Sequence, residues 1–284
     1  MVMPMNAVIF SDLDRTIIPN GPQLESRLAR PMLRQLVNET GIKLVYVSGR
    51  SQELIKEAIA QYDLPMPDFA VGDVGTTIYQ IDSKGWKMVL PWQREISESW
   101  QSKSALELAG MLTDLEFLTP QESTKQSRFK LSYYLAIDDD HAILQQLVSD
   151  RLAAKGIKAA VISSIDESEN KAFLDVLPIN ATKLHAVRFL VREMALTSSQ
   201  AVFCGDSGND LPVLTSEIPA VLVANATQEV RTEAIRESAE AGHSTKLYLA
   251  KGIRELNGNY SAGVLEGAAY FLPTVREWLS RVCP

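Results

Sequence analysis

Short apolar runs alternate with amphipathic segments along the first seventy residues of the chain. Two of these runs have the apolar character of strands that are buried on both faces of a sheet, Ala7–Phe10 and Ile42–Val47, and a third strand is expected at Asp68–Val71. Between them, Gln23–Glu39 and Gln52–Tyr62 place apolar residues at helical spacing. This alternation of strand and helix predicts a doubly wound, Rossmann-like α/β core with a parallel sheet.

The pattern changes in the middle of the chain, where aromatic and β-branched residues gather in short strands such as Phe129–Ile137. This texture predicts an inserted α+β domain over residues 85–173. The segments expected there are strands at Lys87–Leu90, Phe129–Ile137 and Ala159–Ser163, and helices at Ser104–Leu112 and His141–Lys155.

The first pattern resumes near Leu174, so residues 1–84 and 174–284 are expected to form the core domain. Its further elements are a helix at Lys183–Met194, a strand at Ala201–Cys204, a helix at Leu211–Ser216, a strand at Ala220–Val223 and a helix at Gly263–Phe271. Ligands of such sheets bind beyond the carboxyl ends of the strands. Candidate functional residues are therefore sought directly after the apolar runs.

Acidic residues follow two of these runs. Asp12 and Asp14 come after Ala7–Phe10, and Asp206 and Asp210 come after Ala201–Cys204. A carboxylate beside a hydrophobic core is tolerated only when a cation or dense hydrogen bonding compensates it. The two clusters, far apart in sequence, therefore predict one site that binds magnesium and handles phosphate.

Composition narrows the class of protein. The chain has 284 residues, of which 46% are hydrophobic and 22% charged, which is enough to bury a globular core. The net charge of −7 argues against nucleic-acid binding. Met1–Met5 lacks the basic start of a signal peptide and no stretch approaches a membrane span, so we expect a cytoplasmic enzyme. Two cysteines are too few for a disulfide framework, and a monomer is the default.

Four short motifs resemble those of the haloacid dehalogenase (HAD) superfamily of phosphohydrolases, and they occur in the same order. They are Asp12–Thr16, Val45–Arg50, Lys183 and Gly205–Asp210. The insertion between the second and third motifs is similar to the type-2 (C2B) caps of that superfamily. The resemblance therefore implies a catalytic core and a cap that determines substrate specificity.

Within the superfamily, the chain is most similar to the sucrose-phosphate phosphatases and their sugar-phosphatase relatives. The segments that carry this similarity are Gly72–Tyr79, Phe129–Tyr133, Leu174–Pro178 and Ala262–Gly267. Two positions depart from the pattern: Arg15 stands where glycine is common, and Leu184 replaces the glycine that usually follows the lysine.

The resemblance assigns the chemistry to aspartates. Asp12 is expected to be the nucleophile that forms an aspartyl-phosphate, and Asp14 the general acid and base. Mg²⁺ would be held by Asp12, Asp206 and the Asp14 carbonyl, with Asp210 binding it through water or orienting Lys183.

The remaining expected site residues bind phosphate or substrate. Thr16, Ser48 and Lys183 are expected near the phosphoryl group, with Asn209 supporting the acidic loop, while Arg50 is equally consistent with a substrate contact or a surface charge. In the cap, Arg128, Lys130 and Tyr133 are candidates for sugar contacts. The alternative is that Tyr133 packs in the sheet and Lys130 lies on a solvated edge.

These features together indicate a Mg²⁺-dependent phosphomonoester hydrolase that acts on a small sugar phosphate, with sucrose 6-phosphate as the first choice. Glucosylglycerol and glycosylglycerate phosphates are alternative substrates. A phosphomannomutase-like phosphotransferase is a second enzymatic alternative. A third is a non-catalytic phosphatase-like module that partners a glycosyltransferase, although the complete set of carboxylates argues against it.

Overall fold

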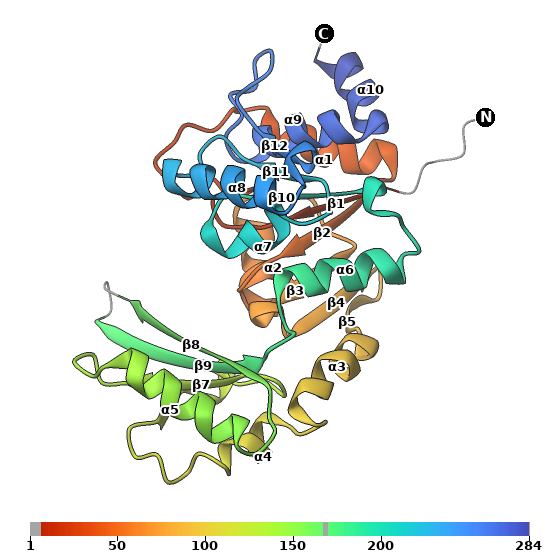
Figure 1. Cartoon of the computed structure of the whole chain (residues 1–284). Helices are drawn as coiled ribbons and strands as arrows, with labels where there is room; N and C mark the ends of the chain where they lie inside the picture. Colours follow the sequence, from red (N-terminus) through yellow and green to blue (C-terminus); the bar gives the residue numbers. More distant parts are fainter. Residues whose placement is uncertain (1–6, 167–169, 284) are drawn as a thin grey trace. The chain divides into compact units, whose positions relative to one another are not determined.

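The computed structural model describes residues 7–166 and 170–283, so Met1–Met5 lies outside the described residues. The chain divides into two compact units, which are visible in Figure 1. The core unit comprises the described parts of Met1–Met88 and Lys183–Pro284, and the cap unit comprises those of Val89–Thr182. No helix among the described residues combines the length and the apolarity needed to cross a membrane.

The core unit is built on an eight-stranded sheet with the order β12-β11-β10-β1-β2-β3-β4-β5. The strands are β1 (Val8–Ser11), β2 (Lys43–Val47), β3 (Phe69–Gly72), β4 (Thr77–Asp82), β5 (Gly85–Met88), β10 (Ala201–Gly205), β11 (Ala220–Leu222) and β12 (Leu247–Leu249). Strands β12 to β3 run parallel, whereas β4 and β5 add an antiparallel hairpin at one edge. The predicted doubly wound α/β fold is confirmed.

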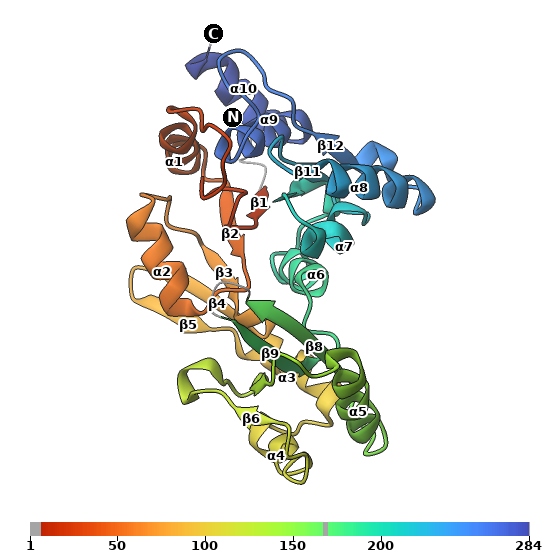
Figure 2. The same ribbon diagram turned by 90° about the vertical axis from the view of Figure 1, so that its left-hand side faces the viewer.

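Helices cover both faces of this sheet (Figure 2). They are α1 (Ala29–Thr40), α2 (Gln52–Gln61), α6 (Lys183–Glu193), α7 (Leu211–Leu214), α8 (Gln228–Glu240), α9 (Ser261–Phe271) and α10 (Pro273–Val282). Helices α1, α2, α9 and α10 share one hydrophobic core with β1, β2 and β10, to which Leu33, Ile55, Leu265 and Trp278 contribute. Helices α6, α7 and α8 cover the opposite face.

Strand β1 lies at the centre of the sheet, between β10 and β2, with Phe10 in register with Phe203 and Val45. All four residues of β1 are buried, as the continuous apolar run predicts. Because β1, β2 and β10 are parallel, their carboxyl ends meet at one edge. This arrangement carries the residues after each strand to the same place.

The cap unit contains a four-stranded antiparallel sheet with the order β6-β7-β9-β8. Its strands are β6 (Thr119–Pro120), β7 (Leu131–Leu135), β8 (Ala159–Asp166) and β9 (Lys171–Pro178), and its helices are α3 (Leu90–Ser97), α4 (Ala105–Ala109) and α5 (His141–Ala153). Helix α5 packs against β8. The cap unit is thus an α+β structure.

Several element boundaries differ from the sequence-based expectation. Helix α1 begins at Ala29 rather than Gln23, and Leu24, counted on its apolar face, is 83% exposed. The strand expected at Lys87–Leu90 is wrong at its end, because Leu90 already begins α3. The core was expected to resume at Leu174, but β9 continues to Pro178 and pairs with β7 and β8 in the cap sheet.

Candidate active site

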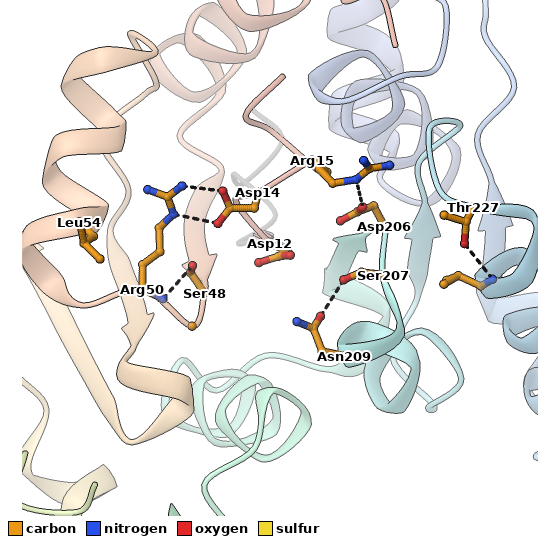
Figure 3. Close-up of a pocket in the computed structure, with 12 residues that line it drawn as sticks. Asp12, Asp14, Arg15, Ser48, Arg50, Leu54, Asp206, Ser207, Asn209 and Thr227 are labelled. Atoms are coloured by element: carbon orange, nitrogen blue, oxygen red, sulfur yellow. Dashed lines mark hydrogen bonds and ion pairs between the residues drawn. The ribbon is translucent and has the colours of Figure 1, made fainter. Parts of the chain in front are cut away.

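The carboxyl ends of β1 and β10 bring three aspartates together. Two of them, Asp12 and Asp206, are labelled in Figure 3. Asp12 follows β1 directly, and its amide N–H donates to the carbonyl of Cys204 in β10 at 2.9 Å. Carboxylate oxygens of Asp12, Asp206 and Asp210 all lie within 4.8 Å of one another, and all three residues are buried. We call these three residues the acidic cluster. The convergence of both predicted acidic segments is therefore observed.

Asp210 is fixed by the loop that carries it. Its Oδ2 accepts hydrogen bonds from the amide N–H of Asp206 at 3.1 Å and from that of Ser207 at 3.2 Å. Gly205 makes this turn possible, since a Cβ at that position would lie 2.6 Å from the Asp210 carboxylate. The loop therefore closes tightly around a carboxylate that has no exposed surface.

Lys183 is the first residue of α6, and its Nζ lies inside the acidic cluster. It is 2.7 Å from Oδ1 of Asp210, 3.1 Å from Oδ1 of Asp12 and 3.2 Å from Oδ1 of Asn209. Burial disfavours its charge, but the carboxylates of Asp210 and Asp12 outweigh burial and raise the pKa of Lys183. The lysine is therefore a cation held by the cluster, and Asn209 supports it.

Asp206 is held through both of its carboxylate oxygens. The hydroxyl of Thr16 donates to Oδ1 at 3.1 Å, and Nε of Arg15 donates to Oδ2 at 3.1 Å. Thr16, which was expected beside the phosphoryl group, has no exposed surface and contacts this carboxylate instead. Burial, together with the charge of Asp210, raises the pKa of Asp206.

The acidic cluster carries more negative charge than its protein neighbours offset. Burial raises the pKa of Asp12 to about 7, with Asp210 adding to the shift and Lys183 opposing it. Three buried carboxylates surrounded by hydrogen-bond donors are a hard oxygen donor set, which is the kind that Mg²⁺ prefers. The residues present therefore fit a divalent cation, with Asp12, Asp206 and Asp210 as its candidate ligands.

The side chain of Asp14 points away from the acidic cluster (Figure 3). Arg50 donates to both of its oxygens, from Nε at 2.8 Å and from Nη2 at 2.6 Å, and Asn20 donates to Oδ1 at 2.8 Å. Partial burial alone would raise the pKa of Asp14, but these bonds and the charge of Arg50 lower it. The structure thus gives Arg50 a partner that the sequence did not reveal.

Ser48 directly follows β2 at the same edge of the sheet. Its amide N–H donates to the carbonyl of Val71 at 2.9 Å, and its hydroxyl accepts a bond from the amide N–H of Arg50 at 3.2 Å. The serine is buried but lines a pocket of about 510 Å³. That pocket is lined by Asp12, Asp14, Arg15, Ser48, Gly49, Arg50, Leu54, Asp206, Ser207, Asn209, Thr227 and Val230. Most of the site residues that the sequence predicted in the core unit therefore line one pocket.

A family model described as sucrose-6F-phosphate phosphohydrolase matches residues 5–272. The chain belongs to this family. The predicted resemblance to sugar phosphatases of the HAD superfamily is thereby confirmed.

Individual relatives agree with the family assignment. A HAD-like hydrolase of Nitrosococcus oceani is 50% identical over 98% of this chain and 75% of its own length. Sucrose-phosphatase 1 of Nicotiana tabacum is 29% identical over 90% of this chain, but the match spans only 59% of the tobacco protein. The structure of the sucrose-phosphatase of Synechocystis, in complex with sucrose and phosphate, has a TM-score of 0.67 and 27% identity, covering 94% of this chain and 98% of that chain.

Relatives of this chain are named for different sugar phosphates: besides the sucrose-phosphatases, a mannosylfructose-phosphate phosphatase of Agrobacterium fabrum is 27% identical over 78% of this chain. Lys130 lines a pocket of about 310 Å³ in the cap unit, where its Nζ lies 3.6 Å from Oδ2 of Asp175. We call this cavity the cap pocket; it is lined by Gln121, Lys125, Lys130, Tyr134, Ser164, Lys171, Phe173 and Asp175. Tyr133 is buried, and Arg128 lies over the Phe129 ring. Of the three candidates, only Lys130 lines this pocket.

Sequence reasoning missed several residues that line the pocket of about 510 Å³ in the core unit. Thr227 accepts a hydrogen bond from the amide N–H of Val230 at the start of α8, and both residues line the pocket. A threonine three residues before an apolar position is a recognisable helix N-cap signal. Asn225 is not among the lining residues, but its backbone carbonyl accepts a bond from Arg15, which lines the pocket, and no local signal in the sequence marks it.

Proposed function

We propose that this chain is a Mg²⁺-dependent phosphatase that releases inorganic phosphate from a small sugar phosphate. The observation that carries the proposal is the buried acidic cluster, with Lys183 paired to Asp12 and Asp210, beside a pocket that Asp12 and Asp206 line. A structural role alone does not account for three buried carboxylates so close together. Family membership supports the same reaction class.

In the first step, a carboxylate oxygen of Asp12 attacks phosphorus, and the bond between phosphorus and the sugar oxygen breaks. The product is an aspartyl-phosphate, and the leaving oxygen accepts a proton from Asp14. In the second step, Asp14 takes a proton from water as the water oxygen attacks phosphorus. Cleavage of the phosphorus–Asp12 bond then returns the carboxylate and releases inorganic phosphate.

Charge compensation is the main contribution of the surrounding residues. A divalent cation held by Asp12, Asp206 and Asp210, with the carbonyl of Asp14 as a further candidate ligand, would offset the repulsion between carboxylate and phosphoryl oxygens. Lys183 supplies a second positive charge next to Asp12. Ser48 lines the pocket and has a hydroxyl hydrogen available for a phosphoryl oxygen.

The pairing of Asp14 with Arg50 shapes its proposed acid–base role. The bidentate bond holds Asp14 in its ionised form, which is the form needed to accept a proton from water. The acid role in the first step requires the protonated form, so Arg50 must release Asp14 before the leaving oxygen is protonated. Arg50 is thus a positioning group within the active site rather than a free surface charge.

The proposed substrate is sucrose 6-phosphate, and the name of the matching family supports this choice. Glucosylglycerol and glycosylglycerate phosphates are the alternatives, because a few cap side chains decide among such sugars. The cap pocket offers Lys130, Asp175 and the paired rings of Tyr134 and Phe173, whose centroids are 5.8 Å apart. Charged groups beside aromatic rings suit a sugar. We therefore propose Lys130 as a sugar contact and assign packing roles to Tyr133 and Arg128.

Assay of phosphate release tests this function. Purified protein would be given sucrose 6-phosphate, the two alternative phosphates, hexose 1-phosphates and p-nitrophenyl phosphate, each with Mg²⁺ or with EDTA. We expect release that requires Mg²⁺ and is fastest with sucrose 6-phosphate. Conversion of a hexose 1-phosphate to its isomer without phosphate release would indicate the phosphomutase alternative. Absence of turnover on every substrate would favour a non-catalytic module beside a glycosyltransferase.

A further inference from the structure

Arg15 adopts a backbone conformation that its residue type rarely takes. Its φ of +57° lies in the left-handed region, which favours glycine and asparagine. Two hydrogen bonds hold it there: its amide N–H donates to Oδ1 of Asn20 at 2.8 Å, and Nδ2 of Asn225 donates to its carbonyl at 2.6 Å. These two bonds fix a backbone conformation that arginine rarely adopts, and they thereby fix the direction in which its side chain leaves the backbone.

The guanidinium of Arg15 contacts the acidic cluster. Its Nε donates to Oδ2 of Asp206 at 3.1 Å, and its Nη2 donates to the carbonyl of Asn225 at 3.2 Å. Figure 3 shows the guanidinium directed at Asp206. Because Thr16 occupies the other oxygen of Asp206, the carboxylate is oriented from two sides. The arginine is therefore anchored by Asn225 at both its backbone and its side chain.

We propose that Arg15 sets the affinity of the acidic cluster for its divalent cation, a role that rests on the metal-binding part of the proposed function. Three carboxylates face two cationic side chains, Lys183 and Arg15. With all three carboxylates ionised, as they would be around a bound cation, the net charge of this group is −1, and it becomes −2 when Arg15 is lost. Arg15 stabilises the metal-free site and opposes the incoming ion. Arg15 acts through Asp206 and is a positioning residue.

Mg²⁺ binding to the substrate-free protein tests this role directly. In Arg15→Gly the guanidinium is removed, and glycine suits the positive φ, so folding is not endangered. Calorimetric titration should show that Arg15→Gly binds Mg²⁺ roughly three- to thirty-fold more tightly than the wild type, as expected for the loss of one charge near a divalent ion. The gain should shrink as ionic strength rises. In EDTA, the glycine variant should melt at a lower temperature despite its relaxed backbone.

Two controls isolate the charge. Arg15→Lys keeps a cation at this position and should bind Mg²⁺ within about two-fold of the wild type. Arg188→Gln removes the partner of Glu217 on the exposed surface of α6, and should leave Mg²⁺ affinity unchanged. This control removes one positive charge beside a carboxylate, as Arg15→Gly does, but the carboxylate lies outside the acidic cluster.

Two results would overturn the proposal. One is that Arg15→Gly binds Mg²⁺ no more tightly than the wild type, and the other is that Arg15→Lys binds Mg²⁺ as tightly as Arg15→Gly does. These outcomes are distinct from failure of the proposed function. If neither the wild type nor Arg15→Gly binds Mg²⁺, the metal site itself is refuted. If the wild type binds Mg²⁺ and one of the results above is obtained, only the role of Arg15 is refuted.

Discussion

The acidic cluster of the core unit and the cap pocket differ in how their charges are compensated. In the cluster, Asp12 is 6% exposed and has a pKa raised to about 7, while its cationic neighbour Lys183 is shared with Asp210. In the cap pocket, Lys130 pairs with Asp175, and both side chains keep some exposure to solvent. The buried negative charge of the cluster thus destabilises the folded protein unless a further cation binds, whereas the charges of the cap pocket already compensate each other. Under the proposed function, the cluster performs the chemistry and the cap pocket selects the substrate.

The largest expected effect comes from Asp12→Asn. An amide cannot form the aspartyl-phosphate, so kcat should fall by at least about a thousand-fold. The measurement is steady-state phosphate release at saturating Mg²⁺. Asp82→Asn, which alters an exposed carboxylate paired with Lys87, serves as the control and should keep wild-type activity. Wild-type turnover by Asp12→Asn would remove the distinction between the two regions.

The second prediction concerns stability of the metal-free protein. The folded pKa of Asp12 is above its unfolded value, so the folded state binds more protons and stability falls as pH rises from about 4 to about 7. The free energy of unfolding, measured with urea in the presence of EDTA, should therefore be about 3 kcal/mol lower at about pH 8 than at about pH 5 because of the Asp12 carboxyl. Asp12→Asn should lack most of that loss. Equal pH slopes in wild type and variant would contradict the unbalanced charge of the cluster.

A smaller effect is expected from Arg50→Gln. Loss of the bidentate pair should raise the pKa of Asp14, because Arg50 is the main group that lowers it. Asp14 then stays protonated to higher pH, and the alkaline limb of kcat/KM should move upward by about one pH unit. Arg34→Gln, which removes the exposed partner of Asp63, is the matched control. A profile that keeps its alkaline limb would indicate that Arg50 does not control this acid.

The smallest effect is expected in the cap pocket. Lys130→Ala should raise KM for the preferred sugar phosphate by about ten-fold while kcat changes little, since one sugar contact is worth about 1.4 kcal/mol. Lys155→Ala removes an exposed lysine outside the cap pocket and should leave KM unchanged. A fall in kcat as large as that of Asp12→Asn would mean that the cap pocket is more than a specificity site.

The sequence predicted the central strands and the acidic cluster because these features have strong local signals. A four-residue apolar run such as Ala7–Phe10 has few alternatives to a buried strand, and aspartates after it are conspicuous. The edge strands had weaker signals: β4 was not predicted, the strand expected at Lys87–Leu90 overlaps β5 only at Lys87 and Met88, and β12 is only three residues long. Strands this short, without a fully buried apolar run, leave few residues in which a pattern can be detected.

The partners of the site residues could not be predicted for a different reason. The pairs between Arg50 and Asp14 and between Arg15 and Asp206 join residues separated by 36 and 191 positions. Such contacts depend on the sheet order and on loop conformations, including the positive φ of Arg15. The cap candidates show the same limit, since Tyr133 and Lys130 differ in burial although both lie near the start of β7.

Chemical trapping of the phosphorylated residue tests the central claim most directly. During turnover with substrate and Mg²⁺, borohydride reduces an aspartyl-phosphate to homoserine, which peptide mass spectrometry locates. We expect homoserine at position 12 in the wild type, and none when Mg²⁺ is replaced by EDTA or when Asp12→Asn is used. Active turnover with Asp12 unmodified, or with the modification at another carboxylate, would contradict the account.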